Sequence, residues 1–323
     1  MDHILKFHSL DVLDFTKLSK EVLDEDKELI VNIEFFDDHD NLKGIVAGDY
    51  DVELDQFIED AKRDGRSFTV RTIHEFNGNW YPWGVFFPPT PPKPEEKSND
   101  EPEEEPKEEP KKEPEDTPEP GPASKEYCLK QRNAQQPEAL AAMGDYGSKY
   151  LMAHRVEDFK TAWRYVVSKF RVAGVNVRFQ LDFNVSNGFN DPTPLRVFYP
   201  GDFWVDQVVV TSYNRAYSSC YHLKWTSFED GFEKTYNEIV SFIGDDVPMG
   251  IAETGTTSWN GDKELWLKET AEVLRTKFPR VREVTWFMID KVQQGFLTDW
   301  QLTTEEQRST FRQGMENLRT SWP

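Results

Sequence analysis

The stretch that decides the fold is Arg71–Gly84, which reads Arg-Thr-Ile-His-Glu-Phe-Asn-Gly-Asn-Trp-Tyr-Pro-Trp-Gly. The residues that lead into it, Ser67–Ile73, are rich in β-branched side chains and have turn-forming glycines on both sides. This pattern is typical of a short buried strand. The pair His74 and Glu75 therefore follows directly after the end of a strand.

Three large aromatic residues, Trp80, Tyr81 and Trp83, come after this strand end. A carboxylate beside aromatic surface loses hydration, which raises its pKa and allows it to act as a general acid near neutral pH. For the His-Glu pair alone, an ordinary strand end with a buried aromatic cluster is the simpler interpretation. Three rings on a loop, where packing does not require them, instead favour contact with the flat faces of a sugar.

The composition favours one large α/β domain or two smaller ones, with enough apolar residues for a packed core. Among its 323 residues the chain has 59 acidic and 38 basic ones, which gives a formal net charge of −21. This charge argues against a nucleic-acid partner and suits a neutral or cationic ligand. No apolar run approaches the roughly 20 residues that span a membrane. Charges also interrupt Met1–Phe15, so we identify no signal peptide there.

The sequence indicates neither a metal site nor a cofactor. The six histidines are scattered and show no ligand spacing. The two cysteines, Cys128 and Cys220, also lack metal-ligand spacing. A disulfide between them is one alternative, and we favour the other, two free buried thiols.

Strands and helices are expected to alternate along the chain, in the order that produces a parallel sheet with right-handed crossovers. The predicted strands are Ile4–Leu10, Leu29–Phe36, Ser67–Ile73, Val175–Phe183, Val205–Ser212, Val247–Ala252 and Val281–Phe287. The predicted helices are Phe15–Leu23, Asp51–Asp64, Val156–Val172, Phe228–Ile243, Asp262–Lys277 and Thr304–Leu318, the fourth behind a capping box that begins at Thr226. This order most closely matches a (β/α)8 TIM barrel, whose functional residues stand at the C-terminal ends of the strands. Five residues of interest fall at such ends: Glu75, Asn184, Tyr213, Glu253 and Trp286.

The segment Pro88–Glu126 interrupts the alternation. Its 39 residues contain 12 of the chain's 20 prolines, and 14 acidic residues against 6 lysines. Such a segment cannot bury enough apolar surface to offset the entropy lost on ordering, so we predict a disordered, acidic, Pro/Glu-rich insertion. A linker between two domains is the alternative. We favour an insertion within a single domain that spans residues 1–323, because three strands are too few for a parallel sheet covered on both faces.

Two of the strand-end residues, Glu75 and Glu253, can face each other across the mouth of such a barrel. Two facing carboxyl groups are the catalytic arrangement of a glycosidase. One protonates the leaving oxygen, and the other attacks the anomeric carbon or activates water. Proton abstraction beside a carbonyl could use the same arrangement, so that alternative stays open.

Four stretches of the chain resemble glycoside hydrolase family 26, the family that includes β-mannanases. Arg71–Gly84 resembles its acid/base strand, Tyr199–Asp206 with Tyr213-Asn214 its next signature, Ile251–Gly255 its nucleophile strand, and Val284–Phe287 with Asp299-Trp300 its last strand and following loop. The resemblance as a whole extends over most of the chain, from about Asp11 to Leu302, apart from Pro88–Leu151.

The resemblance implies a retaining, two-step glycoside hydrolase with Glu75 as the general acid/base and Glu253 as the nucleophile. It implies that His74 and Tyr213 position these carboxylates and that Arg71 lies beneath the site. The predicted substrate-binding residues are Arg71, His74, Trp80, Trp83, Asn184, Tyr213 and Trp286, with Trp80 and Trp286 stacked on the sugar rings that flank the scissile bond.

The chain departs from the family pattern in two places. The family's first strand has no counterpart, and Phe183–Asn187 replaces the usual tryptophan-rich end of the fifth strand. We expect a fragment of a longer precursor whose upstream residues supply the missing strand and a secretion signal. The alternative is that the N-terminal residues or some of Tyr127–Leu151 fill the gap.

The expected activity is endo-acting cleavage of a β-linked plant or algal polysaccharide, with β-1,4-mannan as the first candidate. By the same resemblance we expect a secreted monomer that uses no cofactor and binds neither nucleic acid nor a membrane. Mixed-linkage β-1,3-1,4-glucan and β-1,3-xylan are the alternative backbones. A non-catalytic carbohydrate-binding barrel is the alternative from another class, and the presence of both glutamates favours the enzyme.

Overall fold

A curled parallel sheet forms the centre of the molecule. The computed structural model describes residues 3–36, 41–87, 121–126, 128, 153–293 and 295–321. Its strands are β1 (His3–Ser9), β2 (Glu28–Glu34), β3 (Phe68–Thr72), β4 (Val177–Asn184), β5 (Gln207–Asn214), β6 (Met249–Thr256) and β7 (Val281–Trp286). They lie in chain order, each paired in parallel with the next. This arrangement confirms the predicted α/β fold, an incomplete (β/α)8 barrel with seven strands among the described residues.

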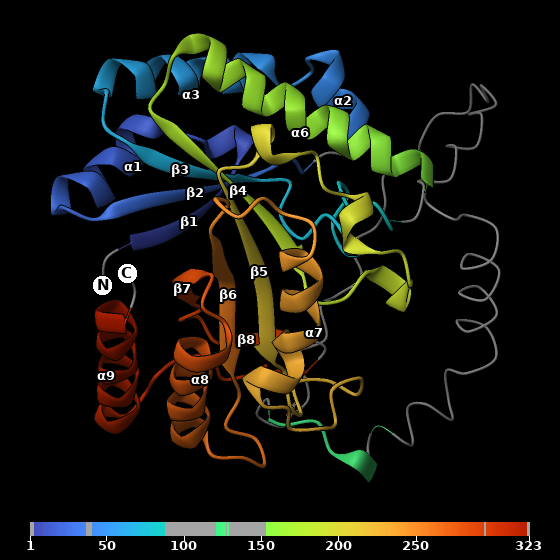
Figure 1. Cartoon of the computed structure of the whole chain (residues 1–323), viewed down its shortest axis with the longest axis vertical. Helices are drawn as coiled ribbons and strands as arrows, with labels where there is room; N and C mark the ends of the chain where they lie inside the picture. Colours follow the sequence, from blue (N-terminus) through green and yellow to red (C-terminus); the bar gives the residue numbers. More distant parts are fainter. Residues whose placement is uncertain are drawn as a thin grey trace, which may run out of the picture.

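Helices connect the strands and lie outside the curled sheet (Figure 1). They are α1 (Phe15–Val22), α2 (Asn41–Ala47), α3 (Asp51–Asp64), α6 (Ala153–Ala173), α7 (Phe228–Val240), α8 (Lys263–Lys277) and α9 (Glu305–Ser321). Gly65 ends α3 as predicted, in the left-handed conformation with a φ of 79°. The cap of α7 is Ser227 rather than the predicted Thr226, because Ser227 Oγ accepts the amide of Asp230 at 3.1 Å. None of the described helices combines the length and apolar character needed to cross a membrane.

The two faces of the sheet differ in chemistry, because successive side chains of a strand point to opposite faces. The outer face packs on the helices through buried rings such as Phe15, Phe57 and Phe68, whose centroids lie 4.9–5.9 Å apart. Buried polar side chains line the barrel interior, among them Asn32, Arg71, Gln180, Asp182 and Gln207. The strand ends therefore stand above a polar interior.

Three local features were not predicted from the sequence. Helix α2 has only seven residues, and a short antiparallel hairpin, β8 (Lys291–Gln293) with β9 (Phe296–Thr298), follows β7. Strand β5 also continues to Asn214, so Tyr213 belongs to the strand rather than to the loop after it. Short elements of this kind carry too few residues for a periodic pattern.

The prediction of disorder for Pro88–Glu126 is wrong at its C-terminal end. Residues 88–120 lie outside the described residues. Beyond them, Gly121 forms a β-bridge with Phe296 of β9, and the Ala123 amide donates to the Tyr217 carbonyl at 2.7 Å. The Ala123 side chain is buried. Residues 121–126 are thus ordered by backbone contacts, which a composition argument does not detect.

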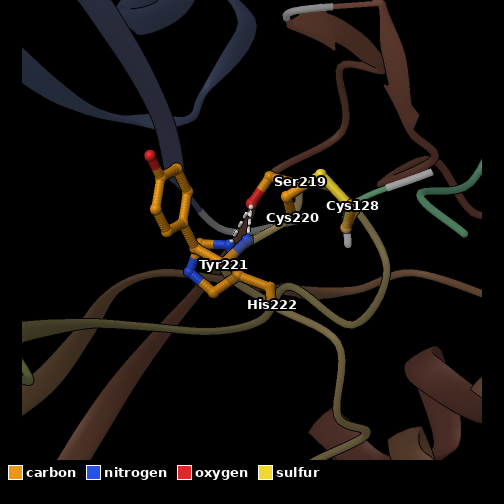
Figure 2. Close-up of a disulfide and its surroundings, with 5 residues drawn as sticks. All are labelled: Cys128, Ser219, Cys220, Tyr221 and His222. Carbon is orange, nitrogen blue, oxygen red and sulfur yellow. Dashed lines mark hydrogen bonds between the residues drawn. A yellow bond between two sulfur atoms is a disulfide. The ribbon is translucent and has the colours of Figure 1, made fainter. Parts of the chain in front are cut away.

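The prediction of free thiols is also wrong. Cys128 and Cys220 form a disulfide across a sequence separation of 92, with Cα atoms 5.2 Å apart. Figure 2 shows this bond beside the Ser219 hydroxyl, which lies 2.8 Å from Nδ1 of His222. The backbone contact of Ala123 with Tyr217 brings the two cysteines into reach, because it holds residues 121–126 against the loop that follows β5.

The first and last strands of the sheet face each other without backbone pairing. Among the described residues, no strand pairs with the outer edge of β1 or of β7. Side chains connect the two strands instead. His3 Nε2 lies 2.9 Å from Thr285 Oγ1, and the ring of Phe7 meets that of Phe287 edge to face with centroids 6.4 Å apart. We call these facing edges of β1 and β7 the seam.

Candidate active site

The backbone after β3 is strained where it delivers the predicted acid/base. Ile73 and Glu75 both adopt left-handed conformations, with φ of 50° and 47°. This region is unfavourable for non-glycine residues, and most of all for a β-branched one such as isoleucine. Such strain persists where surrounding contacts enforce it, and it clusters at functional sites. Both residues are buried, so tertiary packing holds this turn.

The Glu75 carboxyl is held by two side-chain donors. Asn184 at the end of β4 donates from Nδ2 to Glu75 Oε1 at 2.7 Å, and Trp80 donates from Nε1 to Oε2 at 2.8 Å. Asn77 then fixes Asn184: its Oδ1 accepts the Asn184 amide at 2.8 Å, and its Nδ2 donates to the Asn184 carbonyl at 2.9 Å. Asn184, predicted to bind substrate, therefore contacts the predicted acid/base directly.

The three aromatic residues of the loop lie in different environments. Trp80 is 44% exposed and presents a free ring face beside Glu75. A side chain at Gly78 would meet this ring, since an added Cβ would lie 2.5 Å from it. Trp83 is fully buried, donates from Nε1 to the His74 carbonyl at 2.8 Å and stacks on Tyr81. Trp80 is thus exposed beside Glu75, whereas Trp83 supports the loop from below, and its ring has no exposed face in this structure.

The Glu253 carboxyl lies in the middle of the barrel mouth on β6. Its Oε2 accepts a hydrogen bond from the Tyr213 hydroxyl at 2.6 Å, and its Oε1 lies 3.9 Å from Nη1 of Arg71. Burial, and then the charge of the neighbouring Glu75, raise the pKa of Glu253 to about 7 against the opposing effects of Arg71 and Tyr213. The two glutamates therefore interact electrostatically across the site, as their predicted roles require.

Arg71 lies beneath the site, as expected from the resemblance. Its guanidinium is fully buried and donates to Gln180 Oε1 at 2.9 and 3.2 Å and to the Ala252 carbonyl at 3.1 Å. Next to it lies Asp182, which sequence reasoning missed; Thr211 Oγ1 donates to this carboxyl at 3.2 Å. Burial raises the pKa of Asp182 well above its usual range. No motif marks Asp182, since it stands inside a strand and not at its end.

The contacts of His74 differ from those expected. Its Nδ1 lies 3.0 Å from Asn32 Nδ2, which donates to it, and its Nε2 is 3.8 Å from Glu34 Oε1. Burial and the nearby Arg71 lower the pKa of His74 to about 3, so the ring is neutral. Neither Glu75 nor Glu253 is its hydrogen-bond partner among the contacts of the described residues, so a role in positioning them is not supported.

Trp286 does not line the barrel mouth. It is 8% exposed, packs against Trp266 of α8 and Phe311 of α9, and donates from Nε1 to the Trp300 carbonyl at 2.9 Å. Because successive strand residues alternate in direction, the next residue, Phe287, points inward and packs edge to face on Tyr213. The stacking role predicted for Trp286 is therefore not supported by its position.

Two cations at the mouth were missed by sequence reasoning. The Arg215 guanidinium lies 4.7 Å from the centre of the Tyr213 ring, and Lys291 Nζ lies 4.6 Å from that of Phe287. Neither follows a strand end in a recognisable motif. In the part of the chain that the structure describes, no group of three or more His, Cys, Asp or Glu side chains could hold a metal ion.

A parallel barrel with one carboxyl group just after β3 and a second, interacting one on the C-terminal half of β6 has the arrangement of a two-carboxylate glycosidase. In structure, the chain is similar to a modular endo-β-1,4-mannanase of glycoside hydrolase family 26 from Cellulomonas fimi, with a TM-score of 0.52 and 12% identity over 98% of this chain and 62% of that one. A family 26 β-mannanase from Bacteroides ovatus gives a TM-score of 0.49 and 13% identity over 98% and 79% of the two chains. At 12% identity, the likeness to the Cellulomonas enzyme shows a shared barrel fold, which is the fold that the sequence motifs implied.

In sequence, the chain is similar to a protein named Endoglucanase H from Acetivibrio thermocellus, with 23% identity over 265 residues. The match covers 82% of this chain and 22% of that protein, so the chain spans about a fifth of the relative's length. No protein-family model matches the chain.

Proposed function

We propose that the chain is a retaining, endo-acting glycoside hydrolase that cleaves a β-linked polysaccharide, with Glu253 as nucleophile and Glu75 as general acid/base. The observation that carries this proposal is the pair of buried carboxyl groups of Glu75, just after β3, and Glu253, within β6, held by two side-chain donors and by one, respectively. The family 26 fold and the two polysaccharide-cleaving relatives support the same class of reaction.

The raised pKa of Glu253 fits this reaction. Burial and the charge of Glu75 raise the pKa of Glu253 to about 7, so the Glu253 carboxyl ionises as the pH rises through neutrality and can then act as a nucleophile. A retaining glycosidase needs one proton in the pair, on the group that protonates the leaving oxygen, while the other attacks. Both the Tyr213 hydroxyl and the guanidinium of Arg71 favour the ionised form of Glu253.

In the first step Glu253 attacks the anomeric carbon while Glu75 donates its proton to the leaving oxygen. In the second, Glu75 takes a proton from water, and the resulting hydroxide displaces Glu253 from the sugar. The exposed ring of Trp80 lies beside Glu75 and is placed to stack on the sugar of the leaving group. A carboxyl separation of roughly 5–5.5 Å, which retention requires, remains a prediction.

The first candidate for the substrate is β-1,4-mannan, because the Cellulomonas fimi structure is described as an endo-β-1,4-mannanase. Mixed-linkage β-glucan is the second, because the sequence relative is named an endoglucanase. β-1,3-Xylan stays as the third. The test is the release of reducing ends from galactomannan, mixed-linkage β-glucan and β-1,3-xylan, each with and without a chelator.

We expect release from galactomannan that a chelator leaves unchanged. If the chain binds one of these polymers but releases no reducing ends from any of them, it is a carbohydrate-binding barrel and the proposed function is wrong. Proton NMR of the first product distinguishes the two hydrolytic mechanisms, because retention gives the β-anomer before it equilibrates.

A further inference from the structure

A third carboxyl group lies at the mouth of the barrel and has no role in the reaction proposed above. Glu34 ends β2, and its side chain is 15% exposed. Burial, and then the charge of Glu253, raise the pKa of Glu34 to about 7, while Lys291 opposes them. Glu34 therefore lies close enough to Glu253 for the two carboxyl groups to interact electrostatically. Part of its side chain is exposed and can contact a ligand.

A buried donor without a hydrogen-bond partner lies near Glu34. His74 Nε2 has no hydrogen-bond partner, and the ring is 1% exposed. Because Asn32 Nδ2 donates to His74 Nδ1, and the ring is neutral, the proton of the imidazole is on Nε2. A buried N–H group without an acceptor is rare in folded proteins, and at a functional site it indicates an absent ligand.

The distance between the two groups matches one bridging atom. His74 Nε2 and Glu34 Oε1 are 3.8 Å apart, which is too long for a direct hydrogen bond. An oxygen placed about 2.8 Å from each would accept from the Nε2–H group and could donate its own proton to the carboxylate. A hydroxyl group has this combination of one acceptor and one donor function.

We propose that Glu34 and His74 form a hydroxyl-binding pair that holds one ring hydroxyl of the sugar attacked by Glu253, and so select the sugar of the substrate. This inference rests on the proposed function. The charges that face the pair are those of Glu253, Arg71 and Lys291, and the two cations favour the ionised form of a carboxyl group. The pair acts on the glycone, on the side of the scissile bond away from the leaving group.

The test uses dinitrophenyl β-disaccharides of mannose and of glucose, together with analogues that lack the 2-, 3- or 6-hydroxyl of the reacting sugar. Their leaving group needs no protonation, so the assay reports on the glycone side alone. Glu34→Ala should lower kcat/KM about 10–100-fold on one of the two complete sugars, as expected for the loss of a hydrogen bond to a charged group. For one deoxy analogue of that sugar, the wild type and Glu34→Ala should be equal.

The matched control is Glu238→Ala, since Glu238 of α7 is a half-buried carboxylate that accepts the amide of Leu195 outside the barrel. Thermal melting of all variants identifies those that fail to fold, and Glu34→Gln, which keeps the shape of the side chain, replaces Glu34→Ala in that case. Equal losses on every analogue, or no loss on any, would overturn the hydroxyl-binding pair. Failure of the wild-type chain to cleave any of the glycosides would instead overturn the proposed function.

Discussion

The two regions that carry the predicted catalytic carboxyl groups are built by opposite means. Glu253 lies within β6, a strand that is buried along its whole length and stands between β5 and β7, with a register shift beside Glu253 on each side, and a single side-chain donor contacts its carboxyl. Glu75 lies on a strained turn beyond the last hydrogen bond of β3, and two side-chain donors hold it. The proposed nucleophile is thus positioned by secondary structure and the proposed acid/base by a local network.

This difference predicts where each function is vulnerable. Substituting a residue that contacts Glu253 should change the protonation of its carboxyl more than its position, because the strand fixes the backbone. Substituting a residue that contacts Glu75 should change the position of that carboxyl, because only the hydrogen-bond network fixes the turn.

The largest expected effect is that of Glu253→Ala, which removes the nucleophile. We expect kcat on galactomannan to fall by more than about 10³-fold, because no other group forms the covalent intermediate. Added azide should restore turnover and give a glycosyl azide of inverted configuration, which NMR identifies. Wild-type activity of this variant would remove Glu253 from the mechanism.

The next effect is that of Glu75→Ala, and it should depend on the leaving group. We expect a loss of about 10²–10⁴-fold on polysaccharide, where the leaving oxygen must be protonated. The first step should be nearly unaffected with a dinitrophenyl leaving group, so a burst of dinitrophenol should precede slow turnover. A stopped-flow trace measures this burst, and equal losses on both substrates would argue against an acid/base role.

Tyr213→Phe tests whether the contacts around Glu253 control the protonation of its carboxyl group. The Tyr213 hydrogen bond lowers the pKa of Glu253, so its removal raises that pKa. In the wild type, activity should rise as the pH rises through about 7, because Glu253 attacks only in its ionised form. In Tyr213→Phe this rise should occur at higher pH, and kcat in mildly acidic solution should drop about tenfold. The pH profiles of kcat and of kcat/KM measure both, and an unchanged acidic limb would contradict the assignment.

The smallest effect is expected for Asn184→Ala, which removes one of the two donors to Glu75. We expect kcat on galactomannan to fall about 5–10-fold with a normal pH profile, because the remaining Trp80 contact still holds the carboxyl. Ser186→Ala is a suitable control, since its exposed side chain lies two residues further along the same loop. A loss as large as that of Glu75→Ala would show that Asn184 has a further role in the reaction.

The sequence predicted the fold well because barrels repeat one physical pattern. Amphipathic helices and short β-branched runs recur around the sheet, so each element was recognisable by itself. The carboxyl groups at the ends of β3 and β6 followed from the same pattern, since strand ends meet at one face of the barrel. Chain order was therefore sufficient to bring Glu75 and Glu253 together.

The aromatic residues show where this reasoning stops. Trp80 and Trp83 stand three positions apart in one loop, and only packing decides that one is exposed and the other buried. For Trp286 the sequence did not show which face of the sheet the side chain is on, because a shift of one residue along a strand exchanges the two faces. Glu34 and the disulfide depend on contacts between distant parts of the chain, which local patterns do not encode.

The seam between β1 and β7 has a consequence for the motions of the barrel. Successive backbone N–H groups of a strand point to opposite neighbours, so every second amide of these two strands faces the seam rather than a paired strand. Opening there separates side chains only, and we expect amide protons of β1 and β7 to exchange with deuterium far faster than those of β4 and β5. Phe287 follows β7 and Glu34 pairs with Ser9 at the end of β1, so an oligosaccharide that contacts both would connect the two sides of the seam and should slow this exchange.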